Sequence, residues 1–363
     1  MKKLLILLMF ILLIPFKIHA FTSSATSTIL MDMNSGRILY SNNIHTRRSV
    51  ASISKIMTAI VTIESGKLQE EVVVGVEINQ AYGSGIYIKQ GEHIKLEDLL
   101  YGLMLRSGND AALAIANYVG GSVDKFVEMM NEKAVSLGMK NSLFNNPSGL
   151  DQEYGNYSTA YDMAILTSYA MKNATYQKIV STKKHTVTTD MNYYSWTNKN
   201  KLLHSYKYCT GGKTGFTEKA RRTLVTTASK DDLNLVAVTL NDGNDFVDHK
   251  NLFEEAFSKY TNYEIIKSGD IVIPGEKYYT NGTLYLNNSY TYPFSNDEKQ
   301  NIKLKYNLNK QNKYQTGDEV GSVEVYIADE KINAFPIYVR QNETSPKNKN
   351  IFQKLLEWFK NIW

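Results

Sequence analysis

The apolar pattern of the chain changes near residue 262, and this change limits the possible folds more than any other feature of the sequence. Before residue 262, segments with apolar residues at helical spacing lie between strand-like runs. After it, short β-rich runs are separated by Asn, Gly and Pro. The 363 residues are 43% hydrophobic and 21% charged, which excludes disordered, collagen-like and polytopic membrane proteins. We therefore expect an α/β domain over residues 21–261 and a small all-β domain over residues 262–340.

The first domain is expected to contain a mixed sheet flanked by helices. Residues 28–40 predict a hairpin that turns at Asn34-Ser35-Gly36, and residues 223–228 and 233–241 predict paired strands. Because strands lie at both ends of the domain with helices between them, the first and last segments of the sheet should meet. The expected helices cover residues 54–65, 96–105, 110–119, 122–137, 159–172 and 246–260.

The second domain has a weaker pattern. Its expected strands cover residues 271–273, 283–286, 302–306 and 323–327, with turns at Gly317-Asp318 and Asp329-Glu330. It contains no cluster of His, Cys or paired acids that predicts a site.

Residues 1–20 have the features of a secretory signal peptide. Lys2 and Lys3 precede an apolar run over residues 4–14, and Ile18-His19-Ala20 offers a cleavage site. The alternative, an anchor that is never cleaved, is disfavoured because the run is short for a bilayer. Cleavage would remove three lysines and no acid, lowering the formal net charge from +5 to +2. A nearly neutral chain gives no support for nucleic-acid binding.

Residues 351–363 predict an amphipathic helix with an apolar face that contains Trp358 and Trp363. The polar residues 341–350 are expected to be a linker. Four lysines against Glu357 give residues 347–363 a local charge of +3. Such a helix is expected to lie in a membrane interface, which would hold the exported protein on the outer face of the cytoplasmic membrane. The alternative is a helix that docks on the protein's own core.

Cys209 is the only cysteine, so no intrachain disulfide can form. It is expected to be a small buried apolar residue, and a reactive thiol is the less favoured alternative. The core must hold by packing alone.

Three short motifs in the first domain carry the chemistry. Each is weak alone, but their order and spacing together are specific. They are Ser52-Ile53-Ser54-Lys55, Ser107-Gly108-Asn109 and Lys213-Thr214-Gly215.

Lys55 follows Ser52 by one helical turn, so its amine can reach the serine hydroxyl. A serine needs a base to become a nucleophile, and lysine can serve only when it is neutral. The pKa of Lys55 must therefore fall by roughly 3 units from about 10.4. Burial and a second cation can lower it, and Lys213 is a candidate for that cation. A helix cap and a solvated lysine are the alternative for this pair taken alone.

Ser107 and Asn109 are expected on a short connection between two helices. Ser107 can relay a proton, and Asn109 can bind Lys55 or a substrate amide. The alternative is a turn with an N-cap for the following helix.

Lys213, Thr214 and Gly215 are expected on an extended edge strand that can pair with a peptide. Lys213 and Thr214 then offer a cation and a hydroxyl to a carboxylate. Gly215 leaves space for the approach of another backbone. The N–H groups of Ser52 and Phe216 are candidates for an oxyanion hole. The alternative is a Gly-containing turn with an exposed lysine.

The chain resembles the low-molecular-mass penicillin-binding proteins that are serine D-alanyl-D-alanine carboxypeptidases. The resemblance covers about residues 25–260 and is weaker over the β domain, where GDEVGSVEVY carries it; the terminal helix resembles the family's membrane attachment. The segments that carry it in the first domain are ASISK, LRSGNDAALAIA, NPSGLD, YSTAYDMA, TNKNKLL and GGKTGFT.

The resemblance implies a β-lactamase-like antiparallel sheet flanked by helices. It also implies that Ser52 attacks the D-Ala–D-Ala bond of a peptidoglycan stem peptide and that water hydrolyses the acyl-enzyme. Lys55 would be the general base, Ser107 and Asn109 the relay and positioning groups, and Lys213 with Thr214 the carboxylate anchor. β-Lactams would acylate Ser52, and we expect neither a cofactor nor a metal ion.

Two positions depart from the family's pattern. Phe216 stands where many members carry His, which questions a side-chain role there, and Arg221 stands where a small residue is expected.

Three alternative functions remain at this stage. A class A β-lactamase is disfavoured because no Glu lies between Tyr154 and Thr217 to activate water. A transpeptidase or endopeptidase would share the same motifs. An inactive wall-binding module is disfavoured by the intact motif set.

Overall fold

The computed structural model describes residues 23–151, 155–311 and 313–342. The proposed signal peptide and terminal helix lie outside these ranges, as does most of the proposed linker. Contacts divide the chain into two units between Asn262 and Tyr263. Every helix in the described ranges is too short or too polar to span a bilayer.

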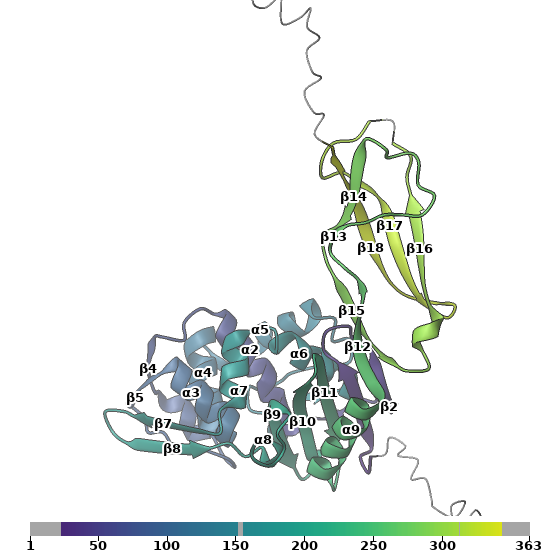
Figure 1. Cartoon of the computed structure of the whole chain (residues 1–363). Coiled ribbons are helices and arrows are strands. Elements are labelled where there is room, and N and C mark those ends of the chain that lie inside the picture. Colours follow the sequence, from purple (N-terminus) through teal and green to yellow (C-terminus); the bar gives the residue numbers. More distant parts are fainter. Residues whose placement is uncertain (1–22, 152–154, 312, 343–363) are drawn as a thin grey trace, which may run out of the picture. The chain divides into compact units, whose positions relative to one another are not determined.

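A five-stranded antiparallel sheet forms the centre of the first unit (Figure 1). All its pairings are antiparallel, as the resemblance implied, so the mixed sheet expected from the strand pattern alone is wrong. The first and last strands pair from Ser27 opposite Leu240 to Asp32 opposite Leu235, which confirms that they meet. In sheet order, the strands are β2 (Ile38–Asn42), β1 (Ser27–Asp32), β11 (Leu233–Leu240), β10 (Arg221–Lys230) and β9 (Cys209–Thr217).

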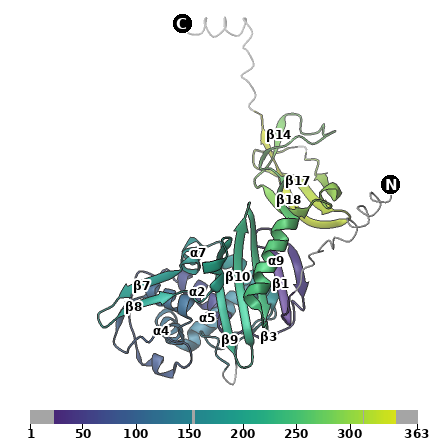
Figure 2. The ribbon, with the colours of Figure 1, turned by 60° about the horizontal axis from the view of Figure 1, so that its bottom comes forward.

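Both faces of this sheet are covered by helices. Alternate residues of a strand point to opposite faces, so neighbouring residues of β1 belong to different cores. Ile29 and Met31 of β1 join the core beneath the large group of helices. Leu30 joins a second core with Leu252 and Phe253 of helix α9 (Asp245–Lys259). Figure 2 shows α9 lying across the sheet beside β10. The helical layer and α9 therefore hold the sheet rigidly between them.

The six helices expected from the sequence are present. The segment expected over residues 96–105 is α-helical only to Tyr101 and continues as a π-turn (η3, Gly102–Arg106), a widening of the helix often found at functional sites. Residue Gly66 has φ +75° and ends the first of these helices, as a glycine C-cap does. The other bounds are α2 (Lys55–Glu64) after the 3₁₀ turn η1 (Ala51–Ser54), α3 (Leu96–Tyr101), α4 (Asn109–Gly120), α5 (Val123–Ser136) and α6 (Ala160–Ala170).

Residues 173–208, for which the sequence predicted no element, form two helices and a hairpin. Asn173 begins the first helix, because its side-chain oxygen accepts hydrogen bonds from the N–H groups of Thr175 and Tyr176. These elements are α7 (Ala174–Ser181), β7 (Lys184–Thr188), β8 (Tyr193–Thr197) and α8 (Lys201–Ser205). Smaller elements are β3 (Arg48–Ser49), β4 (Glu71–Val73), η2 (Val76–Gln80), β5 (His93–Lys95) and β6 (Tyr157–Ser158).

The second unit is all-β, as expected. Its main sheet has the order β13-β14-β18-β17-β16, and β12 pairs with β15. The strand expected over residues 271–273 is absent, and Val272 is 93% exposed. The bounds are β12 (Tyr260–Ile266), β13 (Gly269–Asp270), β14 (Gly282–Leu286), β15 (Tyr290–Ser295), η4 (Lys299–Asn301), β16 (Ile302–Leu308), β17 (Glu319–Ile327) and β18 (Glu330–Gln341).

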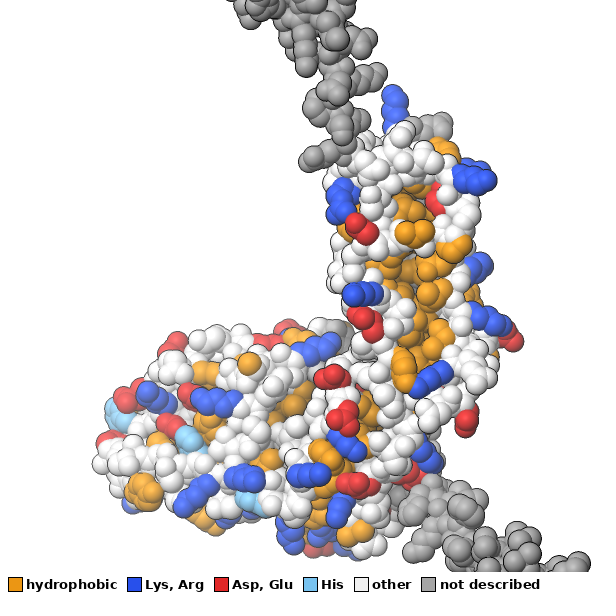
Figure 3. Space-filling model, viewed as in Figure 1, with side chains coloured by type: hydrophobic (Ala, Val, Ile, Leu, Met, Phe, Trp, Pro, Cys, Tyr) orange, Lys and Arg blue, Asp and Glu red, His pale blue; other side chains and the backbone are white. Residues whose placement is uncertain are grey.

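Hydrophobic side chains gather along one face of the second unit (Figure 3). Ring contacts link Tyr290 with Tyr292 and Phe335, and Tyr292 with Phe294. Aromatic pairs of this kind add to the stability of a small core.

Candidate active site

A cleft of about 340 Å³ brings the three motifs together. Ser52 comes from η1, Ser107 follows η3, and Thr214 belongs to the edge strand β9. Of the eight residues singled out in the sequence, Lys55, Asn109 and Lys213 lie behind the cleft, and the others line it. The lining residues are Ser52, Ser84, Ser107, Lys199, Thr214, Gly215, Phe216, Arg222, Asp245 and Phe246.

The Lys55 amine contacts the Ser52 hydroxyl directly. Its Nζ lies 3.2 Å from Ser52 Oγ and 2.7 Å from Asn109 Oδ1, and it also donates to the carbonyl of Ser148. The Lys55 side chain is fully buried. Its three partners are all neutral, so the amine is fixed in place without a carboxylate that would hold its proton.

This environment changes the acidity of Lys55. Burial lowers its pKa well below the usual value, and the charges of Lys213 and Lys199 lower it further. Asp110 opposes the shift. Burial and the two neighbouring cations therefore both favour the neutral amine that a general base requires.

The backbone is strained at two positions beside the cleft, at Ala51 just before Ser52 and at Ser107 itself. Ala51 has φ +50° and Ser107 has φ +65°, in the left-handed region that non-glycine residues seldom adopt. Such conformations persist only where the surrounding structure enforces them, and they concentrate at functional sites. Here they present Ser52 and Ser107 to the same cleft.

Lys213 is the second buried lysine. Its Nζ donates to Ser107 Oγ at 3.1 Å and to the Thr214 carbonyl at 2.9 Å. Burial, with a smaller effect from the charge of Lys199, lowers the pKa of Lys213 to about 7. A bound anion would favour the protonated form of this amine.

Gly215 allows β9 to pass close to the serine. A Cβ at this position would lie 3.0 Å from the Ser52 nitrogen and 2.4 Å from Thr223 Oγ1. Any larger residue would push the strand away from η1. Phe216, the next residue, is 58% exposed and forms part of the cleft wall.

The Ser148 carbonyl, which sequence reasoning did not single out, is held by an asparagine network. Asn146 Oδ1 accepts from the N–H groups of Ser148 and Gly149 at 3.2 and 2.7 Å. Asn156 Nδ2 donates to Asn146 O at 2.8 Å and to Ser54 Oγ at 3.0 Å. The segment NPSGLD, which carries the family resemblance, contains Asn146 and Ser148. Nothing in the sequence, however, indicates that the main-chain carbonyl of Ser148 would contact Lys55.

Lys199, in the quoted segment TNKNKLL, was also missed. Its Nζ lies 3.3 Å from Ser84 Oγ on the cleft wall. Burial and the charge of Arg106 lower its pKa. Within the described part of the chain, Lys199 and Lys213 form no ion pair, whereas Arg222 pairs with Asp245. Lys199 on the cleft wall and Lys213 behind it therefore have no carboxylate partner in the described residues, and in their protonated forms they suit an anionic ligand.

Cys209 and Arg221 both lie in surroundings that differ from those expected from the sequence. Cys209 is half-buried rather than buried, and it packs at the edge of the second core. Burial raises the pKa of its thiol to about 11, which is the opposite of a reactive thiol. Arg221 is exposed, so its size disturbs no packing.

The antiparallel sheet and the serine–lysine contact define a class of active-site serine enzymes that includes penicillin-binding proteins. Residues 15–244 match the family model "Peptidase S11: D-alanyl-D-alanine carboxypeptidase", and residues 260–345 match "Penicillin-binding protein 5, C-terminal domain". The chain belongs to this family of D-alanyl-D-alanine carboxypeptidases, and it is a serine carboxypeptidase of the hydrolase class.

Individual relatives agree with the family model. The chain is 30% identical over 338 residues to the D-alanyl-D-alanine carboxypeptidase DacF of Bacillus subtilis, covering 88% of this chain and 85% of DacF. The crystal structure of penicillin-binding protein 5 from Haemophilus influenzae has a TM-score of 0.77 and 27% identity, covering 88% of this chain and 98% of that chain. The crystal structure of penicillin-binding protein 6B from Escherichia coli has a TM-score of 0.71 and 28% identity, covering 89% of this chain and 98% of that chain. The resemblance and the fold class inferred from the sequence are thereby confirmed.

Proposed function

We propose that the protein removes the terminal D-Ala from peptidoglycan stem peptides through an acyl-enzyme on Ser52. The observation that carries this proposal is the 3.2 Å contact between Lys55 Nζ and Ser52 Oγ. It lies within a site whose burial and neighbouring cations lower the pKa of Lys55. Membership of the carboxypeptidase family supports the choice of reaction.

In the acylation step, Ser52 Oγ attacks the carbonyl carbon of the D-Ala–D-Ala bond, and its proton passes to the neutral Lys55 amine. The N–H groups of Ser52 and Phe216 are proposed to stabilise the oxyanion. The carbon–nitrogen bond then breaks, and the leaving amine takes a proton through Ser107. Asn109 holds the Lys55 amine in position.

Water completes the cycle. It attacks the ester carbonyl and gives a proton to Lys55. The bond to Ser52 Oγ breaks, and the oxygen recovers its proton. A β-lactam acylates Ser52 in the same way, but its leaving nitrogen stays attached to the acyl group and blocks the approach of water.

Recognition of the terminal carboxylate is assigned to cations and a hydroxyl on the cleft wall. Lys213 and Thr214 would anchor the carboxylate, with the charge of Lys199 nearby. The paired Arg222 and Asp245 leave this balance of charge unchanged.

The test is Ser52→Ala. We expect complete loss of D-Ala release and of covalent labelling by a fluorescent penicillin, because Ser52 Oγ is the one hydroxyl that contacts the Lys55 amine among the described residues. Ser205→Ala, on an exposed serine of α8, is the matched control and should retain both. Labelling that survives in Ser52→Ala would place the nucleophile elsewhere.

Export and membrane attachment are further proposals that rest on residues 1–20 and 351–363 of the sequence. Membership of a family of cell-wall enzymes supports export, and an amphipathic basic helix would hold the protein on the outer face of the cytoplasmic membrane. Truncation after Asn350 should release an active enzyme into the soluble fraction. A truncated protein that still sediments with membranes would contradict this anchor.

A further inference from the structure

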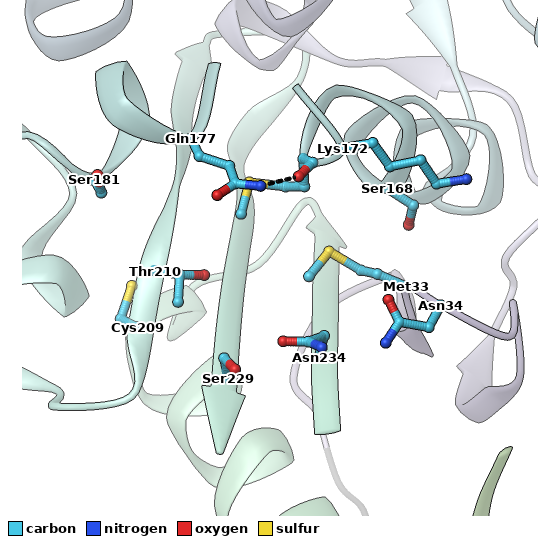
Figure 4. Close-up of a pocket in the computed structure, with 11 residues that line it drawn as sticks. Met33, Asn34, Ser168, Lys172, Gln177, Ser181, Cys209, Thr210, Ser229 and Asn234 are labelled. Carbon is cyan, nitrogen blue, oxygen red and sulfur yellow. Dashed lines mark hydrogen bonds between the residues drawn. The ribbon is translucent and has the colours of Figure 1, made fainter. Parts of the chain in front are cut away.

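A second cavity, of about 560 Å³, lies at the opposite end of β9 from the Ser52 cleft (Figure 4). Thr210 lines it and Gly215 lines the cleft; five residues of extended strand span about 17 Å. Its volume falls in the range of small-molecule sites. Its lining residues are Met33, Asn34, Ser168, Met171, Lys172, Gln177, Ser181, Cys209, Thr210, Ser229 and Asn234.

Most of the lining residues have neutral polar side chains that end in amides or hydroxyls, and two methionines and a cysteine complete the set. It contains no carboxylate and no aromatic ring. Lys172 supplies the one charge, and Figure 4 shows its ammonium directed away from the middle of the cavity. A charged ligand would therefore find little to pair with, whereas an uncharged ligand with many hydroxyl and amide groups would.

Several of these polar groups are held in fixed positions. Thr210 Oγ1 donates to Thr227 Oγ1 at 2.7 Å, and Gln177 Nε2 donates to the Met171 carbonyl at 2.6 Å. Ser168 differs, because its buried Oγ has no hydrogen-bond partner among the described residues. Most buried hydroxyls are paired, so Ser168 has an unused capacity at the wall of the cavity. Met33 lines the same cavity with a flexible side chain.

The strands that line the cavity contribute their ends, where they are already paired with one another. Residues Thr227 and Ala228 of β10 pair with Gly211 and Cys209, and Ser229 pairs with Asn234. Strand β9 is the edge of the sheet, but near the cavity its Cys209 N–H donates to the Tyr206 carbonyl at 3.0 Å and its Gly211 carbonyl accepts from Asn200 Nδ2 at 3.2 Å. These contacts occupy part of the strand edge, which disfavours an extended peptide.

We infer that this cavity binds an uncharged N-acetylated sugar. Amide and hydroxyl side chains match the acetamido and hydroxyl groups of such a ligand, and the thioethers of Met33 and Met171 can cover its C–H face. Identifying the sugar with the glycan of peptidoglycan rests on the proposed function. The cavity and its chemistry do not depend on it.

The experiment uses the full-length protein acylated with benzylpenicillin, so that the Ser52 cleft is blocked. A peptide-free tetramer of N-acetylglucosamine is titrated in and followed by calorimetry and saturation-transfer NMR. We expect binding that Thr210→Met, which fills the cavity, weakens at least tenfold. Gln177→Leu, on the exposed rim, should weaken it several-fold and cannot be dismissed as a folding defect.

Two controls make the outcome decisive. Gln69→Leu, on an exposed glutamine elsewhere, and Lys172→Gln should both leave binding unchanged. Absence of binding, or binding that neither cavity variant weakens, would overturn the proposal. Loss of binding in Lys172→Gln would also overturn it, by showing that binding depends on the lysine rather than on the neutral groups of the cavity. D-Ala release from a soluble tripeptide should be unchanged in the cavity variants, which separates this test from that of Ser52.

Discussion

The two cavities at the ends of β9 differ in the number of charged side chains that line or back them. The Ser52 cleft is backed by two buried lysines that form no ion pair in the described part of the chain, although burying a charge is costly. The cavity beside Thr210 is built almost entirely from neutral groups. A single strand thus supports one site arranged to move protons and hold an anion, and another suited only to binding. The cost of burying Lys55 and Lys213 is accepted where chemistry requires lowered pKa values.

The largest effect should follow from removing the deeper cation of the cleft. Lys213→Ala should lower kcat/KM for a substrate with a free terminal carboxylate by roughly a hundredfold, which corresponds to about 3 kcal/mol. An amidated substrate should lose much less, because it has no carboxylate to bind. The measurement is the ratio of the two losses, which cancels any shared effect on Lys55. Equal losses would contradict the anchoring role.

A smaller effect is expected from Lys199→Gln. The charge of Lys199 lowers the pKa of both Lys55 and Lys213, so its removal should raise both. Activity rises with pH as Lys55 loses its proton and falls as Lys213 loses its own near pH 7. Both limbs of the kcat/KM profile should therefore move to higher pH, with roughly a threefold loss on the acid side.

Lys140→Gln, on an exposed lysine, is the control for this profile. If the rising and falling limbs of the kcat/KM profile keep their positions in Lys199→Gln, the charge of Lys199 has a negligible effect on Lys55 and Lys213.

The smallest effect concerns the neutral end of β9. Because burial raises the pKa of Cys209 to about 11, iodoacetamide at pH 7.5 should modify it a few hundredfold more slowly than a free thiol, roughly in proportion to the thiolate fraction. Urea-unfolded protein, which has the same single cysteine, should react at the free rate. Rapid modification of the folded protein would show that this region is more open or more polar than the structure indicates.

The sequence predicted the parts of the site that reside in side-chain type and spacing. Ser52 and Lys55 are one helical turn apart, so their contact follows from their spacing. Gly215 indicated a strand that another backbone approaches closely, because glycine has no side chain in the way. The Ser148 carbonyl could not be predicted, because every residue has a carbonyl and only the fold aims this one. Lys199 looked like a solvated lysine, and its role depends on a loop position that no local pattern encodes.

The fold was predicted where apolar periodicity is strong and missed where it is weak. Apart from the buried Trp196, the hairpin β7–β8 alternates between exposed and half-exposed residues, so it lacks the clear apolar face that marks a strand. The triplet 271–273 has strand-like residues but leaves Val272 in solvent. Tertiary pairing, rather than local preference, decides such segments.

The order of strands in the main sheet also governs when the enzyme can become reactive. A ribosome completes Ser52 and Lys55 well before β9, β10 and β11, and β1, which pairs locally with β2, finds its second partner only in β11. Contacts this distant in the chain form late and slowly. A nascent or truncated chain that ends before β9 would therefore carry the serine without the cation that helps deprotonate its lysine, and it would be chemically silent until the last strand of the sheet is in place.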